Sequence, residues 1–155
     1  MQSKQDLIAE VIYEARANEA ATQAFDLAAY EKLGVNVTDG RCLGIIDNEG
    51  PLTAGRLADL TGLTTAAITT VLDRLERAGY ARRVRDAADR RRVIVELTPE
   101  LRARNERIWG AIAREAYEAF ARMSREELTA ARKFFRLSRA LNEQHAARVR
   151  ELSLD

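Results

Sequence analysis

Arginine side chains gather in one short segment near the middle of the chain. Residues 81–92 hold six arginines and two aspartates, a local net charge of +4, whereas the whole chain has a formal net charge of +1. A guanidinium group stays protonated at any usable pH, and it can bind phosphate or enter the narrow, electronegative minor groove of DNA. The alternative for such a run is a solvated charged face. We assign the predicted DNA contacts of this segment to Arg83, Arg85, Arg90, Arg91 and Arg92.

A second group of side chains suited to DNA lies on one face of a predicted helix. Over residues 64–78, apolar side chains recur at positions 68, 71, 72, 75 and 78, which indicates a buried stripe on an amphipathic helix. The other face carries small hydroxyl and methyl groups in its first turns and arginine later. Such a face can approach base edges and thymine methyl groups in the major groove. The residues of this helix expected to contact DNA are Thr64, Thr65, Ala66, Thr69, Thr70 and Arg74.

The chain lacks the residue combinations of the common catalytic and metal sites. It has one cysteine, Cys42, and one histidine, His145, so neither an internal disulfide nor a Cys/His metal cluster is expected. No nucleophile elbow, Walker loop or GxGxxG motif is present. We therefore expect no enzymatic activity and no cofactor.

Cys42 stands among apolar residues, and we interpret it as a small hydrophobic residue of the core. A thiol redox sensor at this position remains the alternative. His145 lies on the apolar stripe of the last predicted helix, where a packed or interface histidine is expected rather than a ligand or a catalytic base.

Length and composition fit one globular domain without a membrane anchor. The chain has 155 residues, of which 46% are hydrophobic and 32% charged. No stretch approaches the roughly 18 consecutive apolar residues of a transmembrane helix. Charged residues spread through residues 1–20 leave no room for the apolar core of a secretory signal. We expect a cytoplasmic protein with no membrane partner.

Capping residues and glycines bound the elements that must position these side chains. A long helix is expected over residues 5–33 and ends at Gly34. Thr38 is expected to cap the next helix, which ends near residues 48–51. Thr53 then caps a short helix, bounded by Gly62, and is counted among the expected DNA contacts.

The period of the sequence changes after the helix at residues 64–78. Two short β-prone runs at residues 80–84 and 92–97 flank the polar loop at residues 85–91, which predicts a hairpin with a charged tip. Helix is expected to restart with Thr98 as the cap and Pro99 as the first helical residue. Ser124 and Glu127 form an S-x-x-E capping box that opens the last helix.

Two short helices joined by a tight turn and followed by a basic hairpin are the arrangement of a winged helix-turn-helix. The predicted fold class is therefore mainly α with a small β-hairpin wing (α+β). Within a single domain over residues 1–155, the DNA-binding lobe is expected at residues 37–98, flanked by long helices at residues 1–36 and 99–155. The apolar stripe of the last helix needs a partner surface, which favours a homodimer that reads two half-sites.

Four motifs in this region resemble those of the MarR-type transcriptional regulators. They lie at residues 52–58 (LTAGRLA), 63–69 (LTTAAIT), 72–80 (LDRLERAGY) and 86–92 (DAADRRR), and the last two are the most specific. In that family a proline usually follows the first aspartate of the wing motif, where this chain has Ala87. The charged residues of the motif are all present.

The resemblance implies a homodimeric repressor that binds a palindromic operator in double-stranded DNA through two winged modules. Residues 64–74 would form the recognition helix, Arg91 would enter the minor groove, and Asp89 would orient it. Arg90 and Arg92 would lie against the DNA backbone. The terminal helices would interlock as dimerisation helices, and a small aromatic or anionic effector would release the operator. A winged-helix protein-interaction module and a redox-sensing regulator acting through Cys42 remain alternatives.

Overall fold

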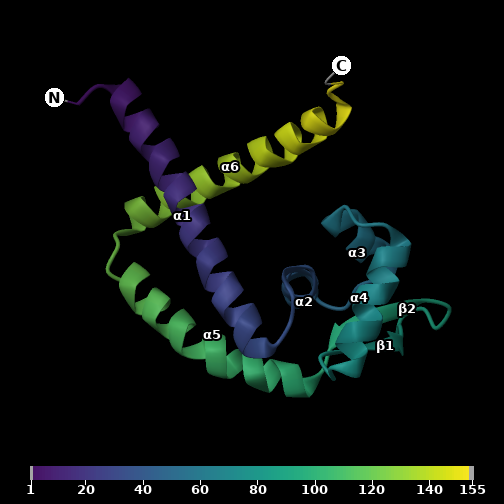
Figure 1. The fold of residues 1–155 in the computed structure, drawn as a ribbon. Coiled ribbons are helices and arrows are strands. Elements are labelled where there is room, and N and C mark those ends of the chain that lie inside the picture. The colour runs from purple at the N-terminus through teal and green to yellow at the C-terminus, as the bar shows by residue number, and fades with distance from the viewer. Residues whose placement is uncertain (1, 154–155) are drawn as a thin grey trace. The chain divides into compact units, whose positions relative to one another are not determined.

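The computed structural model describes residues 2–153 of the chain and contains six helices and one two-stranded sheet in that range (Figure 1). This mainly helical architecture with a small hairpin confirms the predicted fold class. The chain divides into two compact units, Met1–Ile108 and Trp109–Asp155. In chain order the elements are α1 (Lys4–Leu33), α2 (Val37–Glu49), α3 (Ala54–Thr61), α4 (Thr65–Arg77), β1 (Ala81–Arg85), β2 (Val93–Leu97), α5 (Pro99–Phe120) and α6 (Arg125–Glu151).

The long first helix agrees with its sequence prediction, whereas the cap of the second does not. α1 ends at Gly34, whose φ of 69° is a left-handed conformation that glycine adopts without strain. α2 is capped by Asn36 and not by Thr38, so that prediction was wrong. The Asn36 side chain accepts a hydrogen bond from the backbone N–H of Asp39 at 2.9 Å, and its extended backbone starts the helix at Val37, which places Thr38 inside the first turn.

α1 packs closely on the start of α2. A Cβ atom added to Gly40 would collide with the aromatic ring of Tyr30 on α1. Only glycine lets the α2 backbone approach that ring so closely. The contact joins the long N-terminal helix to the lobe that carries the hairpin.

The helix-turn-helix has the predicted caps. Thr53 caps α3 and Thr64 caps α4, and each side-chain oxygen accepts a hydrogen bond from a backbone N–H of the first turn, both at 3.2 Å. Gly62 ends α3 with a φ of 72°. The core beneath these helices consists of buried aliphatic side chains, among them Ile46, Leu57, Ile68, Leu72, Leu75 and Leu101.

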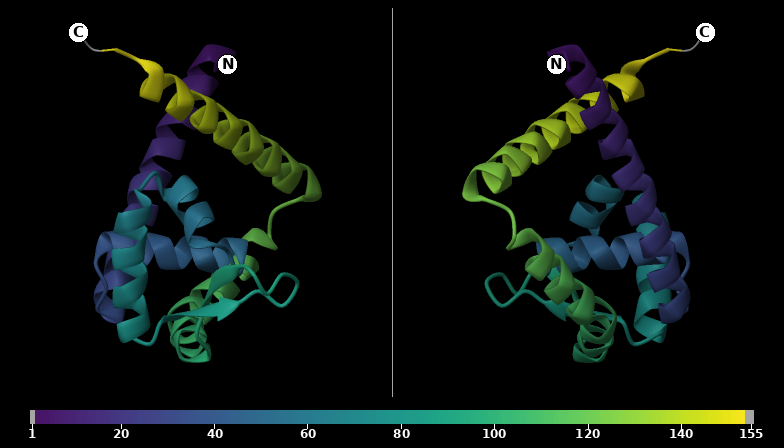
Figure 2. Two further views of the ribbon diagram at one scale, coloured as in Figure 1. Left: turned by 90° about the vertical axis from the view of Figure 1, so that its right-hand side faces the viewer. Right: turned by 90° about the vertical axis from the view of Figure 1, so that its left-hand side faces the viewer.

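The hairpin pairs β1 with β2 in an antiparallel register that runs from Ala81 opposite Leu97 to Arg85 opposite Val93. The backbone of Leu52 extends the sheet through two hydrogen bonds with Val95, at 3.2 and 2.8 Å. Because Val95 and Leu97 are buried, the base of the hairpin is fixed to the core. Its loop extends beyond the paired strands (Figures 1 and 2).

Tyr80 lies buried where α4 gives way to β1. Its hydroxyl donates a hydrogen bond to the carbonyl oxygen of Leu33 at 2.6 Å and accepts one from Nη1 of Arg104 at 2.8 Å. The end of α1, the base of the hairpin and the start of α5 therefore meet at one side chain. α5 begins at Pro99 with Thr98 as its cap, as predicted.

In the second unit, α6 opens with the predicted capping box of Ser124 and Glu127. The backbone hydrogen bond from Ser124 lowers the pKa of the Glu127 carboxyl. None of the described residues of α6 is buried. Several of its large apolar side chains are exposed, including Leu128, Phe135, Leu137, Leu141 and Val149. Among residues 2–153, no helix combines the length and the apolar character needed to cross a membrane.

Candidate nucleic-acid interface

The exposed face of α4 is made of small side chains. Thr65, Ala66, Thr69 and Thr70 are exposed, whereas the residues at positions 68, 71, 72 and 75 form the buried face. The Thr69 hydroxyl donates to the carbonyl oxygen of Thr65 at 3.0 Å, and that of Thr70 donates to Ala66 at 3.1 Å. Because these hydroxyl protons are already used, the face offers oxygen lone pairs and methyl groups. No bulky side chain among these four would keep the helix away from a groove.

Arg74 of α4 pairs with a carboxylate inside the lobe. Its Nε and Nη2 atoms donate to the two oxygens of Asp39, at 2.9 and 2.5 Å. Asp39 is 4% exposed and belongs to the first turn of α2. The hydrogen bond to Asp39 raises the pKa of Arg74 above its ordinary value. This arginine was expected to contact DNA, and it also joins α2 to α4.

Arg83 of β1 likewise points back to α4. Its guanidinium forms ion pairs with Glu76 and, at 2.9 Å, with Oδ1 of Asp73. The backbone N–H of Arg83 donates to Oε1 of Glu76 at 2.8 Å, and Nη2 reaches the carbonyl oxygen of Thr69 at 3.5 Å. The hairpin and the exposed helix are therefore joined by side chains next to the predicted DNA-contacting face.

The end of β1 and the hairpin loop keep their arginines at the surface. Arg85, Arg90, Arg91 and Arg92 are all exposed. Nη1 of Arg85 donates to the carbonyl oxygen of Arg90 at 2.9 Å, which braces one side of the loop. The exposed cluster has the positive charge that phosphate or minor-groove binding requires, and its contact with DNA stays a prediction.

Asp86 and Asp89 shape the loop through its backbone. The Asp89 side chain accepts from the backbone N–H of Arg91 at 3.0 Å, and its carbonyl oxygen accepts from that of Arg92 at 2.9 Å. Asp86 accepts from the backbone N–H of Ala88 at 2.9 Å. Such aspartate turns fix the loop without the proline that Ala87 replaces. Asp89 orients the Arg91 backbone directly, and the orientation of the Arg91 guanidinium by Asp89 stays a prediction.

Cys42 lies inside the core of the lobe, with 0% of its surface exposed. Burial raises the pKa of its thiol, nearby Asp39 raises it further, and Arg41 and Arg74 act in the opposite direction. A thiol that is both buried and held protonated is a poor nucleophile. This environment fits the predicted packing role.

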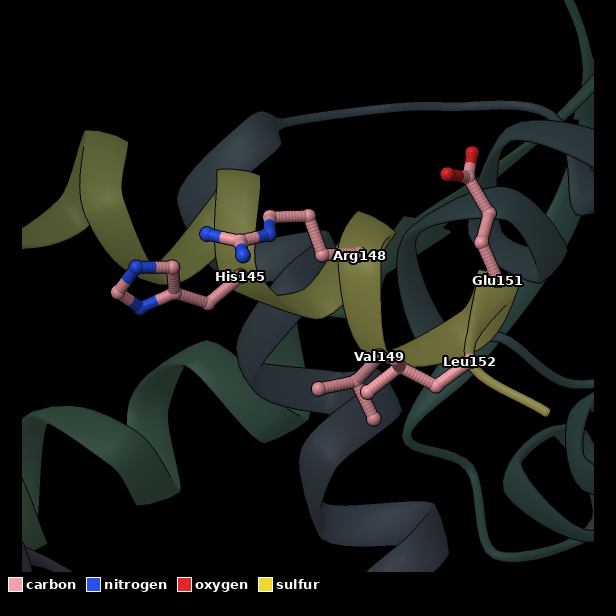
Figure 3. A pocket seen from close by; sticks show the side chains of 5 residues that line it. All are labelled: His145, Arg148, Val149, Glu151 and Leu152. Atoms are coloured by element: carbon pink, nitrogen blue, oxygen red, sulfur yellow. The ribbon is translucent and has the colours of Figure 1, made fainter. Parts of the chain in front are cut away.

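Over residues 2–153, no group of three or more His, Cys, Asp or Glu side chains is placed to hold a metal ion. A hollow at the end of α6 is lined, among the described residues, by side chains from the last turns of this helix and by its C-cap (Figure 3). These residues are His145, Arg148, Val149, Glu151 and Leu152.

The sequence did not reveal Asp39, Asp73 and Glu76 as parts of this region. Asp39 is 35 positions from Arg74, and Glu76 is separated from Arg83 by the end of a helix. A weak signal existed for the acids of α4. Asp73 and Glu76 are three residues apart and therefore share one side of a helix, next to a strand rich in arginine.

Comparisons with known proteins agree with the fold and with the helix-turn-helix region. Residues 33–92 match the model of the MarR family. Over 74 residues the chain is 46% identical to the HTH-type transcriptional regulator YcgE of Bacillus subtilis (strain 168). This match covers 48% of each chain. It is 33% identical over 73 residues to YfiV of the same organism, also named an HTH-type transcriptional regulator. This second match covers 47% of this chain and 46% of YfiV. The chain thus spans about half the length of the curated relatives it matches.

Solved structures resemble the chain over most of its length. A MarR family protein from Bacillus stearothermophilus aligns with a TM-score of 0.63 at 23% identity, over 94% of this chain and 99% of that one. The transcriptional regulator BldR from Sulfolobus solfataricus aligns with a TM-score of 0.54 at 26% identity, over 90% of this chain and 99% of that one. These alignments indicate that the chain shares its fold with both structures.

Proposed function

We propose that this chain, whose residues 33–92 match the MarR family model, is a winged helix-turn-helix transcriptional regulator of that family and represses transcription as a homodimer bound to a palindromic operator. The family consists of regulators rather than enzymes. The proposed partners are double-stranded DNA in the cytoplasm and a second copy of the chain. α4 would enter the major groove, and the hairpin loop would enter the adjacent minor groove.

The observation that carries the proposal is the nearness of two different DNA-directed surfaces in one lobe. The exposed face of α4 is small and hydroxyl-rich, and the last residue of β1 together with the loop beyond it exposes four arginines. A small helical face suits base edges in the wide groove, whereas arginine suits the potential of the narrow one. We propose that Thr65, Ala66, Thr69 and Thr70 contact bases. Thr53, Thr64, Arg85, Arg90, Arg91 and Arg92 would contact the backbone or the minor groove.

Exposed apolar side chains at both ends of the chain support the homodimer. On α1, Leu7, Ile8, Val11 and Ile12 are each at least 38% exposed, and their spacing places them on one side of the helix. On α6, five large apolar side chains are likewise exposed. Exposed apolar side chains grouped on one side of a helix, as on α1, are typical of interaction sites. A dimer would also place two winged modules on one palindrome, which strengthens binding over a single module.

We propose that a small aromatic or anionic effector weakens operator binding by changing the separation of the two modules. The support is the connection between α1 and the lobe, which passes through the packing of Tyr30 on Gly40 and the hydrogen bond from Tyr80 to Leu33. A shift of α1 in the dimer would therefore also move the base of the hairpin.

Selection from a pool of random DNA duplexes, followed by a salt titration, tests the proposal. The purified chain is expected to enrich duplexes with two related half-sites about one helical turn apart. If the dimer neutralises about 6 to 10 phosphates, affinity for the selected duplex should fall by roughly 10³ to 10⁵ between 50 and 200 mM salt. Absence of enrichment, or binding that does not respond to salt, would refute DNA recognition.

A further inference from the structure

Arg83 connects the wing to the helix proposed to read the major groove. It lies on β1, opposite Val95 in the register of the hairpin, and its side chain is 30% exposed. Both its main chain and its guanidinium bind α4. The backbone N–H donates to Glu76 at 2.8 Å, and Nη1 pairs with Glu76 and, at 2.9 Å, with Asp73. A single residue of the strand thus contacts two carboxylates on neighbouring turns of the helix.

The neighbouring arginine on the same strand makes a different connection. Arg82 pairs with Glu96 of β2, with 2.7 Å from Nε and 2.6 Å from Nη2 to the same carboxylate oxygen. Successive side chains of a strand point to opposite faces. Arg82 therefore joins the two strands of the wing to each other, whereas Arg83 joins the wing to α4.

The wing needs such an anchor because it is small. Two strands of five residues form the hairpin, and an isolated two-stranded hairpin is only marginally stable in water. A small change of angle at the base moves the arginine-bearing loop by a larger distance. The loop and α4 can occupy adjacent grooves of one duplex only if the angle between them is held.

We infer that Arg83 is a positioning residue for DNA binding, which sets the angle between wing and recognition helix through Glu76 and Asp73 instead of contacting phosphate itself. The inference rests on the proposed function, because it concerns the same interface. It also gives Glu76 and Asp73 a role in DNA binding, although both carry the charge that phosphates repel.

The sign of the effect at Glu76 separates positioning from direct contact. Removal of an acid beside the DNA face should strengthen binding if only charge matters, and it would free Arg83 to reach a phosphate. If Arg83 acts through Glu76, the same change weakens binding. Glu76→Ala is therefore expected to bind the selected duplex about tenfold more weakly, close to the loss in Arg83→Ala. The double variant should be little weaker than either single variant.

The matched control is Arg82→Ala, which removes the same charge from the same strand and leaves the link to α4 intact. Its affinity should change by less than about threefold. The charge-reversed pair, Arg83→Glu combined with Glu76→Arg, should recover part of the affinity lost in Arg83→Glu alone. All variants are measured by fluorescence anisotropy on one duplex selected with the unaltered chain, and their unfolding free energies are compared.

Two results would overturn the inference. One is tighter or unchanged binding by Glu76→Ala, and the other is a charge-reversed pair as weak as Arg83→Glu alone, because each makes Arg83 a direct contact. If the unaltered chain selects no duplex, the proposed function fails. Hydrogen exchange of the free protein then tests whether Arg83 and Glu76 anchor the wing to α4. Faster exchange of the amides at residues 85–92 in both Arg83→Ala and Glu76→Ala supports the anchor, and unchanged exchange refutes it.

Discussion

Asp39 on α2 holds Arg74 on α4 in a two-point contact, with 2.9 Å between Oδ2 and Nε and 2.5 Å between Oδ1 and Nη2. Nδ2 of Asn36 also donates to Oδ2 of Asp39, at 3.0 Å. The carboxylate lies in the first turn of α2, where the partial positive charge of the helix N-terminus favours it. The helix that follows α1 is thus tied to the proposed recognition helix by a buried carboxylate.

Asp39→Asn should lower the free energy of unfolding by about 1 to 3 kcal/mol, because an amide cannot accept both guanidinium donors and its own N–H groups would face one of them. Urea denaturation at pH 7 measures the change. Asp47→Asn is the matched control, since Asp47 is an exposed residue of the same helix. Equal stability of the two variants would show that the contact with Arg74 contributes nothing to the fold.

The exposed wing arginines should behave in the opposite way. Arg91→Ala should weaken binding to the selected duplex by about 1 to 3 kcal/mol and leave the unfolding free energy unchanged, because Arg91 is exposed. Anisotropy titrations and urea denaturation of the same samples check both parts. Arg102→Ala serves as the control, since it removes an exposed arginine of α5 outside the proposed interface. Equal affinity of Arg91→Ala and the unaltered chain for the duplex would show that the Arg91 side chain of the loop does not contribute to DNA binding.

The boundaries of the elements could be predicted because local residues set them. Gly34 and Gly62 end their helices in left-handed conformations, and Thr53 and Thr64 cap theirs through side-chain oxygens. Asn36 displaced Thr38 as a cap because both residue types suit that position, and only the path of the backbone decides between them. A local rule predicts that a cap exists near a boundary more securely than it predicts which residue forms it.

The partners of the arginines could not be predicted in the same way. Arg74 and Arg83 were placed with the DNA contacts because they share a polar face or a basic run with other candidates. Their carboxylate partners come from a different helix or lie beyond a change of secondary structure. Pairing across the fold depends on how α2, α4 and β1 pack, and charge patterning along the sequence does not contain that information.

The buried thiol of Cys42 should make stability depend on pH in the alkaline range. Because burial raises its pKa in the folded protein, the unfolded thiol ionises first, near its ordinary pKa of about 8.5. The contribution of the neutral Cys42 thiol to the free energy of unfolding is therefore complete below that pH. It is lost as the pH rises through the higher pKa of the folded protein. Urea denaturation between pH 7 and 10 should show a steeper fall for the unaltered chain than for Cys42→Ala.

The same thiol should react slowly with a disulfide reagent such as dithionitrobenzoate in native buffer and rapidly in urea. Slow labelling follows from its burial and its protonated state. Fast labelling of the folded protein, together with an oxidant effect on DNA binding that Cys42→Ser abolishes, would instead support the redox-sensing alternative.

The apolar side of α1 should control the oligomeric state. Ile8 and Ile12 are 49% and 50% exposed, lie one turn apart, and have neighbours on the same side of the helix in Leu7 and Val11. A carboxylate in the centre of an apolar interface loses its hydration without gaining a partner. Ile8→Glu combined with Ile12→Glu should therefore shift the chain from dimer to monomer in sedimentation velocity and reduce its affinity for a two-half-site duplex.

Ala17→Glu adds the same kind of charge on the opposite side of α1 and should leave the dimer intact. A dimer that survives both glutamates, or an unaltered chain that sediments as a monomer at micromolar concentration, would mean that this side of α1 is not the dimer contact.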